Sequence, residues 1–245
     1  MTEKLREYLA DPTSYPAVFM YGADGNGGLW KTRNVPAKYS DLWLEDLPES
    51  LGDNLVTYAT VEKYISNVIE YVDSKKVSLF LFSKPSAENR FGTGQGKTVA
   101  AVTILNHYLY SRLRLHLRGE KEITDNPVYF LKGTELQTTF NAQFRGNFDM
   151  QTVASEKYYS MKDRAKKVDL LVLDDVATKG TTESFTDELY EIIDHRVAEE
   201  LVTIYTSNVT MDEIADLQGD RIASRIAQDT VAIAFGGKDW RRRTL

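Results

Sequence analysis

A glycine-rich segment that ends in a lysine and a threonine carries the clearest chemical signature in this sequence. Residues 91–98 read Phe-Gly-Thr-Gly-Gln-Gly-Lys-Thr. Glycines let backbone N–H groups turn toward an anion, and the N-terminus of a following helix adds partial positive charge. We expect Lys97 to reach the β- and γ-phosphates of a nucleotide and Thr98 to ligate Mg²⁺. The backbone of the loop would cradle the phosphates through Gly92, Thr93, Gly94, Gln95 and Gly96.

This loop departs from the strict phosphate-loop pattern at its start. Phe91 stands where the pattern G-x-x-x-x-G-K-[ST] has glycine, and residues 83–90 form an unusually long link from the preceding apolar run. An ordinary glycine-rich turn before a helix is the alternative. Because the Gly-Lys-Thr end is intact between a predicted strand and a predicted helix, the sequence favours nucleotide binding.

Two adjacent acids supply a second chemical feature. Asp174 and Asp175 follow a largely apolar run at residues 168–173, Val-Asp-Leu-Leu-Val-Leu. A carboxylate after a buried strand holds Mg²⁺ in phosphate-loop NTPases, which is the role we expect for Asp174. Asp175 could then polarise an attacking water as general base. Taken alone, the pair could open a loop or cap a helix; together with the loop it predicts hydrolysis of ATP.

The elements that must position these groups alternate along the chain. Apolar runs at 77–82, 128–131, 168–173, 201–205 and 230–235 predict strands, and helical patterns lie between them. This alternation predicts an α/β fold with a central parallel sheet between helical layers. We further expect a hairpin tip at residues 22–28, an irregular polar segment at 139–167, and a capping box from Ser184 to Asp187.

Composition narrows the possible classes of protein. The 245 residues are 42% hydrophobic and 27% charged, include no cysteine and only three scattered histidines, and carry a net charge of −6. Disulfides and thiolate zinc sites are therefore excluded. The acidic balance argues against nucleic-acid binding over the whole surface but permits a local basic groove. The sequence shows neither a membrane-length apolar run nor the apolar core of a signal peptide, so we expect a cytoplasmic protein.

Several ordered segments resemble one family. The stretches at 170–176 (Leu-Leu-Val-Leu-Asp-Asp-Val), 205–208 (Tyr-Thr-Ser-Asn) and 219–226 (Gly-Asp-Arg-Ile-Ala-Ser-Arg-Ile) are similar to DnaC/DnaI-type bacterial and phage replicative helicase loaders. These are AAA+ ATPases with IstB-like relatives, and the resemblance covers roughly residues 36–245. It implies an AAA+ P-loop NTPase fold. This sequence departs from the family at both ends, since the N-terminal region is short and only a brief piece follows Asn208, so we expect a short N-terminal extension and little or no helical lid. Residues 1–50 would form an N-terminal arm and collar, with possible partner docking, and 51–245 the ATPase domain.

The resemblance also implies roles for residues outside the loop and the acid pair. Asn208 matches a polar sensor residue. Arg225, supported by Arg221, matches an arginine finger that acts on ATP held by a neighbouring subunit, which requires self-association. Arg241 matches a second sensor near the γ-phosphate, and Arg242 is the neighbouring choice.

The function implied by the resemblance is ATP- and Mg²⁺-dependent loading of a DnaB-type hexameric helicase onto single-stranded DNA. An IstB-type transposition helper ATPase shares almost all the motifs and is one alternative. A non-hydrolysing nucleotide-binding adaptor, suggested by Phe91, is another. Interleaved aromatic and basic residues could contact the DNA strand, although a surface helix over the core explains them equally well: Arg145, Lys157, Tyr158 and Arg164.

Overall fold

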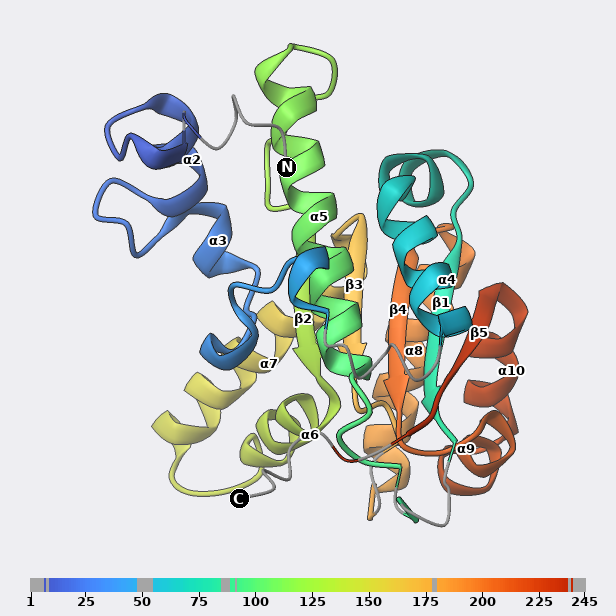
Figure 1. The fold of residues 1–245 in the computed structure, drawn as a ribbon. Coiled ribbons are helices and arrows are strands. Elements are labelled where there is room, and N and C mark those ends of the chain that lie inside the picture. Colours follow the sequence, from blue (N-terminus) through green and yellow to red (C-terminus); the bar gives the residue numbers. More distant parts are fainter. Residues whose placement is uncertain are drawn as a thin grey trace, which may run out of the picture.

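Five parallel strands form the centre of the molecule. The computed structural model describes residues 7, 9–47, 55–84, 89–90, 92–177, 180–237 and 239. The strands stand in the order β2-β3-β4-β1-β5 (Figure 1). The predicted α/β class and the parallel sheet between helical layers are confirmed. The strands are β1 (Ser78–Ser83), β2 (Val128–Lys132), β3 (Leu170–Asp174), β4 (Val202–Ser207) and β5 (Thr230–Phe235).

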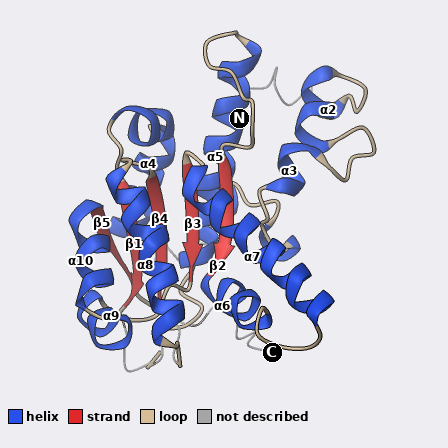
Figure 2. Ribbon diagram, turned by 180° about the vertical axis from the view of Figure 1, so that it is seen from behind, coloured by secondary structure: helices blue, strands red, loops and turns tan. Residues whose placement is uncertain are grey.

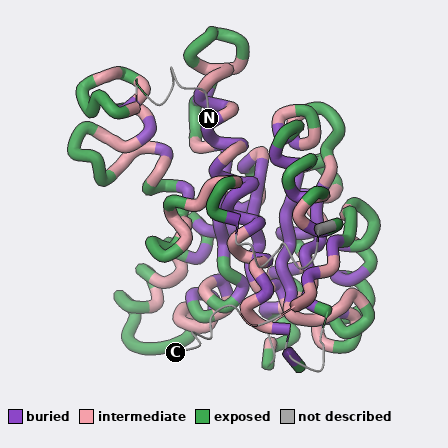
Figure 3. The backbone as a smooth tube through the Cα atoms, in the orientation of Figure 1, coloured by how far each residue is buried: buried purple, intermediate pink, exposed green. Residues whose placement is uncertain are grey.

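Helices cover both faces of the sheet, because alternate strand residues point to opposite sides. Leu79 and Leu81 of β1 join a core with α4 and α5, whereas Phe80 joins a second core with α6 to α10. Figure 2 shows this second layer from behind, and Figure 3 shows the strands buried between the two layers. The helices are α2 (Tyr15–Tyr21), α3 (Gly28–Thr32), α4 (Leu55–Ser66), α5 (Lys97–Leu117), α6 (Gly133–Ala142), α7 (Phe148–Lys167), α8 (Glu183–Ala198), α9 (Met211–Gln218) and α10 (Asp220–Asp229).

The hairpin expected at residues 22–28 is wrong, because this turn joins two helices. The Ser14 hydroxyl caps α2 by accepting from the Ala17 amide at 3.2 Å. The chain then reverses direction and begins α3 at Gly28, where a Cβ would lie only 2.5 Å from the Met20 carbonyl oxygen. The glycines thus serve the close approach of two short helices, and Figure 1 shows α2 and α3 beside the C-terminal half of α5.

Two further expectations about local structure are wrong. Most of the segment expected to be irregular is the 20-residue helix α7, which Asn147 caps through the Met150 amide. Its buried apolar residues, Tyr158, Met161 and Ala165, recur at helical spacing, but the polar residues between them hide that period. The capping residue of α8 is Thr182, which accepts from the Phe185 amide at 3.3 Å, rather than Ser184.

The segment at residues 33–40, which follows α3, is attached to the sheet and its helices by the buried side chain of Arg33. Arg33 donates to Asn106 of α5 at 2.8 Å and to the Ser40 backbone oxygen at 2.9 Å. The Phe130 amide of β2 donates to the Arg33 carbonyl, and the Asn34 side chain donates back to the Phe130 carbonyl. This segment therefore covers part of the β2 edge, where unpaired backbone groups would otherwise face outward. The division of the chain at residue 50 stays a prediction.

Two expectations concern a helical lid after the last strand and membrane-spanning helices. In the described part of the chain, β5 is the last helix or strand, and the expectation of little or no helical lid stays a prediction. Every described helix is too short or too polar to cross a bilayer.

Stability should fall in mild acid because of His107 on α5. Its Nε2 accepts from the Leu44 amide at 3.3 Å, and burial lowers the pKa of His107 to about 4. The unfolded chain, with a histidine pKa of about 6.5, takes up this proton first. Stability is therefore full above about pH 6.5 and declines toward pH 4, by up to about 3 kcal/mol. Urea unfolding at pH 7 and pH 5 should show a smaller loss for His107→Gln than for wild type; equal losses would contradict the assignment.

Candidate active site

The glycine-rich loop connects β1 to α5 by a tight path. Gly92 has a φ of 59°, in the left-handed region, and a Cβ there would lie 2.4 Å from the Ser83 Cβ. Glycine is thus required at this position both for conformation and for space. Phe91 lies outside the described residues. Gly92, one place later than the strict pattern has its first glycine, packs against Ser83 at the end of β1.

Lys97, the first residue of α5, joins three parts of the site. Its buried Nζ donates to the Ser83 hydroxyl, to the Gly92 carbonyl at 3.3 Å, and to Asn208 Oδ1 at 2.9 Å. Ser83 ends β1 and Asn208 follows β4, so this ammonium group stands where two neighbouring strands end. Ser83 is a contact that our sequence analysis missed.

The two acids separate into different environments. Thr98 Oγ1 donates to Asp174 Oδ1 at 2.8 Å, and Asp174 is buried. Asn208 Nδ2 donates to Asp175 Oδ1 at 3.0 Å. A hydroxyl and a carboxylate in contact are hard oxygen donors, which Mg²⁺ prefers, and Mg²⁺ with a nucleotide commonly uses few protein ligands. The donor set of Thr98 and Asp174 therefore fits this ion.

Asp175 has an unusual backbone that depends on its neighbours. Its φ of 60° is left-handed, which is uncommon outside glycine. A Cβ at Gly133, the first residue of α6, would approach the Asp175 carbonyl oxygen to 2.7 Å. The Asp175 amide donates to Thr206 Oγ1 at 2.9 Å. Gly133 and Thr206 are further residues that sequence reasoning missed: Gly133 stands in no recognised pattern, and the segment 205–208 drew attention to Asn208 rather than to Thr206.

The loop also contacts the segment that follows β5. Gln95 Nε2 donates to the Gly237 carbonyl at 3.2 Å, and Thr93 Oγ1 donates to Asp239 Oδ2 at 3.2 Å. The segment that leads toward Arg241 therefore lies on the loop. Arg241 and Arg242 themselves lie outside the described residues, so their sensor role stays a prediction.

Arg225 is placed apart from this cluster. It lies on α10, and its Nε forms an ion pair with Asp194 Oδ1 of α8 at 2.7 Å. Nearby, the Arg221 guanidinium stacks over the Tyr190 ring, 4.1 Å from its centroid. The structure thus leaves Arg225 on an outer surface and brings together six of the predicted residues: Gly92, Lys97, Thr98, Asp174, Asp175 and Asn208.

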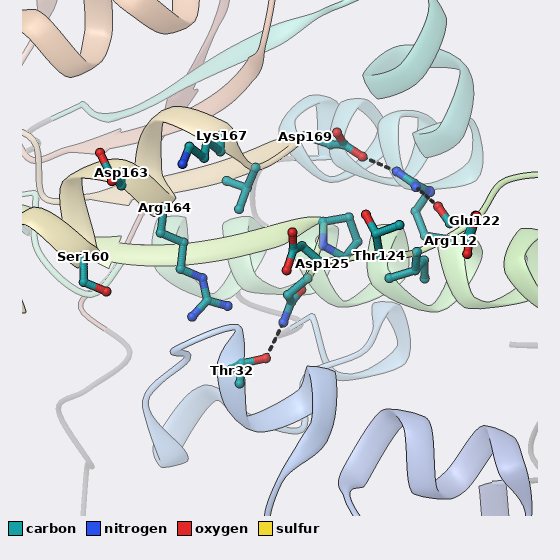
Figure 4. A pocket seen from close by; sticks show the side chains of 14 residues that line it. Thr32, Arg112, Glu122, Thr124, Asp125, Ser160, Asp163, Arg164, Lys167 and Asp169 are labelled. Carbon is teal, nitrogen blue, oxygen red and sulfur yellow. Dashed lines mark hydrogen bonds and ion pairs between the residues drawn. The ribbon is translucent and has the colours of Figure 1, made fainter.

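A separate cavity of about 840 Å³ opens at the amino ends of β2 and β3 (Figure 4). It shares no residue with the candidate active site. Its charges nearly balance, and Arg112 and Asp169 of its lining already form an ion pair with one another. Nothing in this arrangement favours one class of ligand. Its charged lining consists of Arg112, Arg164, Lys167, Glu122, Asp125, Asp163 and Asp169.

Comparison with known proteins identifies the fold. No protein-family model and no curated protein matches the sequence. Among solved structures, a DnaC helicase loader has 18% identity and a TM-score of 0.56, covering 82% of this chain and 99% of that one. A DnaI structure has 21% identity and a TM-score of 0.56, covering 82% and 95%. AMPPCP-bound DnaA from Aquifex aeolicus has 20% identity and a TM-score of 0.52, covering 82% and 51%. The chain therefore has the fold of these proteins, and the resemblance to DnaC and DnaI is confirmed at the level of fold.

Proposed function

We propose that this chain is a Mg²⁺-dependent ATPase that binds a DnaB-type hexameric helicase and assists its placement on single-stranded DNA. The observation that carries the proposal is the convergence of three sequence segments at the carboxyl edge of the sheet. Lys97 and Thr98 come from the loop, Asp174 and Asp175 from the end of β3, and Asn208 from the end of β4. The fold shared with helicase loaders supports the choice of partner.

The residues divide the chemistry of ATP hydrolysis between them. Lys97 would bind the β- and γ-phosphates, and Thr98 with Asp174 would hold Mg²⁺, which neutralises phosphate charge. Asp175 would accept the proton of the attacking water while the Asn208 amide orients its carboxylate. Arg225 of a neighbouring subunit and Arg241 would stabilise charge on the transferred phosphoryl group. Hydrolysis would thereby be tied to self-association.

Purified partners test the proposed function directly. The wild-type chain, with ATP and Mg²⁺, should co-elute with a purified DnaB-type hexamer in size-exclusion chromatography and increase its loading onto circular single-stranded DNA. A transposase of the kind served by IstB-type ATPases provides the parallel arm. Binding to the transposase and not to the helicase would replace the proposal with that alternative. Nucleotide binding without turnover in either complex would favour a non-hydrolysing adaptor.

Asp175→Asn should retain ATP binding and lose turnover by about 10²-fold or more, since a carboxamide cannot act as general base. Its amide oxygen can still accept from Asn208, so the local geometry should persist. Asp174→Asn is the comparison variant, because it should instead weaken the Mg²⁺-dependent part of ATP binding. Steady-state ATPase assays and nucleotide titrations measure both effects, and wild-type turnover in Asp175→Asn would exclude Asp175 as the base.

The structure changes the set of side chains available to a DNA strand. Tyr158 is buried and donates to Glu188 at 2.7 Å, so it cannot stack on a base. Phe144 and Phe148 are 69% and 80% exposed, on either side of Arg145. Figure 1 shows this connection between α6 and α7 at the carboxyl edge of the sheet. Two exposed rings and a cation within five residues suit a flexible single strand, where bases stack on aromatic rings.

Phe144→Ala/Phe148→Ala should therefore lower affinity for single-stranded DNA by about tenfold or more, since each stacked base contributes on the order of 1–3 kcal/mol. Fluorescence anisotropy with a labelled oligonucleotide at two salt concentrations measures this, and the remaining binding should still weaken with salt. Tyr159→Ala, which removes a 57% exposed ring elsewhere on α7, is the matched control. Equal losses in the control and the double variant would remove the α6–α7 connection from consideration.

A further inference from the structure

One buried hydroxyl contacts both acids of the candidate active site. Thr206 lies near the end of β4 and is 2% exposed. Its Oγ1 donates to Asp174 Oδ1 at 2.8 Å and accepts from the Asp175 amide at 2.9 Å. A threonine hydroxyl has one proton. The Thr206 hydroxyl oxygen accepts the hydrogen bond from the Asp175 N–H, and the single hydroxyl proton is donated to the Asp174 carboxylate.

The same residue supports the turn that carries Asp175. The Thr206 carbonyl accepts from the Val176 amide at 3.0 Å, so Thr206 binds the chain on both sides of Asp175. Between these two contacts the Asp175 backbone is left-handed, with a φ of 60°. Such a conformation persists in a non-glycine residue only where surrounding contacts hold it. Thr206 provides two of these contacts, and the absence of a side chain at Gly133 provides the space.

We propose that Thr206 is a positioning residue that sets the Asp174 carboxylate for Mg²⁺ and the Asp175 carboxylate for the attacking water. This inference rests on the proposed ATPase function and adds a residue to it. Thr98 also donates to Asp174 Oδ1, at 2.8 Å, but its hydroxyl is the one that would turn to the metal ion. Thr206 then keeps the carboxylate in place. One hydroxyl thus couples metal binding to the placement of the base.

The decisive measurement is the gain in affinity that Mg²⁺ gives to a non-hydrolysable ATP analogue, measured with Mg²⁺ and with EDTA. Wild type should bind more tightly with Mg²⁺. Thr206→Val keeps the shape but leaves a buried amide and a carboxylate oxygen without this partner, so the gain should fall by about tenfold. Affinity in EDTA should be unchanged, since Lys97 and the loop remain. Thr206→Ser restores the hydroxyl and should come within about threefold of wild type.

A second buried threonine on the same strand separates positioning from stability. Thr203 is 1% exposed, and its hydroxyl accepts from the Arg196 Nε at 2.8 Å, away from both acids. Thr203→Val should lower the melting temperature and keep the Mg²⁺-dependent gain. The proposal is wrong if both Thr203→Val and Thr206→Val lose the Mg²⁺-dependent gain in affinity in proportion to the fall in their melting temperatures. The loss would then reflect lower stability and not the positioning of the acids.

The remaining outcomes are also distinct. A full Mg²⁺-dependent gain in Thr206→Val overturns the inference and leaves the proposed function standing. A wild-type chain that binds the analogue equally with Mg²⁺ and with EDTA overturns the inference as well. Wild-type binding with the expected gain but without ATP turnover contradicts the ATPase proposal, while the affinity test of Thr206 remains decisive. Failure of wild type to bind the analogue at all overturns both.

Discussion

Lys97→Ala should abolish detectable ATP binding, with a loss of affinity of about a hundredfold or more. Hydrogen bonds from an ammonium group to phosphate oxygens are charge-assisted and contribute on the order of 1.5–3 kcal/mol each. The Lys97 Nζ is held beside the loop by the Gly92 carbonyl and Asn208. A phosphate bound in the loop would therefore lie in contact with the Lys97 ammonium group. Titration with a fluorescent ATP analogue measures the loss.

The same substitution should leave the protein folded. Lys97 is 7% exposed, and burial of an ammonium group carries a desolvation cost that its contacts must offset. Lys97→Met, which keeps most of the side-chain volume, should melt at the wild-type temperature or above and bind no nucleotide. If Lys97→Ala and Lys97→Met both fail to fold, the loss of ATP binding would be explained by a structural role of Lys97 alone.

Lys84 offers a matched control beside the same loop. Its side chain is exposed, and its contribution to the loop is a backbone carbonyl that accepts from Gln95 at 3.3 Å. Lys84→Ala preserves that carbonyl and should bind ATP as wild type does. Unchanged ATP affinity in Lys97→Ala, or an equal loss in Lys84→Ala, would contradict the phosphate-loop assignment.

Arg225→Ala should lower ATP turnover by about 10³-fold, the effect typical of an arginine finger. In the single chain Arg225 pairs with Asp194, and both side chains are partly exposed, at 40% and 38%. Ion pairs at such positions are weak, because water and salt screen them. The guanidinium can therefore leave Asp194 for the phosphates of a neighbouring subunit. ATP affinity of the isolated chain should stay unchanged, since the finger acts across a subunit boundary.

Mixing two inactive variants tests this arrangement. Arg225→Ala retains an intact loop, and Lys97→Ala retains an intact arginine. Mixed assemblies would contain interfaces that pair the loop of one variant with the arginine of the other, so part of the turnover should return. Absence of rescue, with co-assembly shown by analytical ultracentrifugation, would mean that Arg225 serves its own subunit or has no role in turnover.

Two controls separate this role from a structural one. Asp194→Ala removes the partner of Arg225 and should keep turnover within a few-fold of wild type. If the ion pair itself were what mattered, Asp194→Ala would reproduce the loss. Arg118→Ala removes an exposed arginine near Glu120, 3.7 Å from it at the far end of α5, and should have no effect.

Sequence alone determined the sheet and the ends of its strands. Each buried strand of a parallel sheet is a continuous apolar run, which is visible without any structure. The polar residues that interrupt β1, β3 and β4 at their carboxyl ends must then meet at one edge. For this reason the glycine-rich loop with Lys97 could be predicted to lie at the same edge as Asp174 and Asp175, whereas Asn208 was added by the family resemblance.

Helix α7 and the N-terminal helices depended on tertiary packing. Helix α7 has few apolar residues, and the many polar residues between them leave no recognisable helical pattern in the sequence. The packing of these few apolar residues on the sheet therefore decides that the segment is helical. The glycines before α3 predict a reversal of the chain equally well between two strands or two helices. Only the fit of α2 and α3 against α5 distinguishes these possibilities.

The supporting contacts of the candidate site were also decided by tertiary structure. Thr206 contacts Asp174, which is 32 residues away in the sequence, and Lys97 contacts Asn208, which is 111 residues away. Gly133 matters because the carbonyl of Asp175, in the turn after β3, approaches it. No local pattern encodes such pairs, because each depends on strand order and on the register between β3, β4 and β1. Sequence determined which groups could do the chemistry, and the packing of neighbouring strands decided which residues hold them in place.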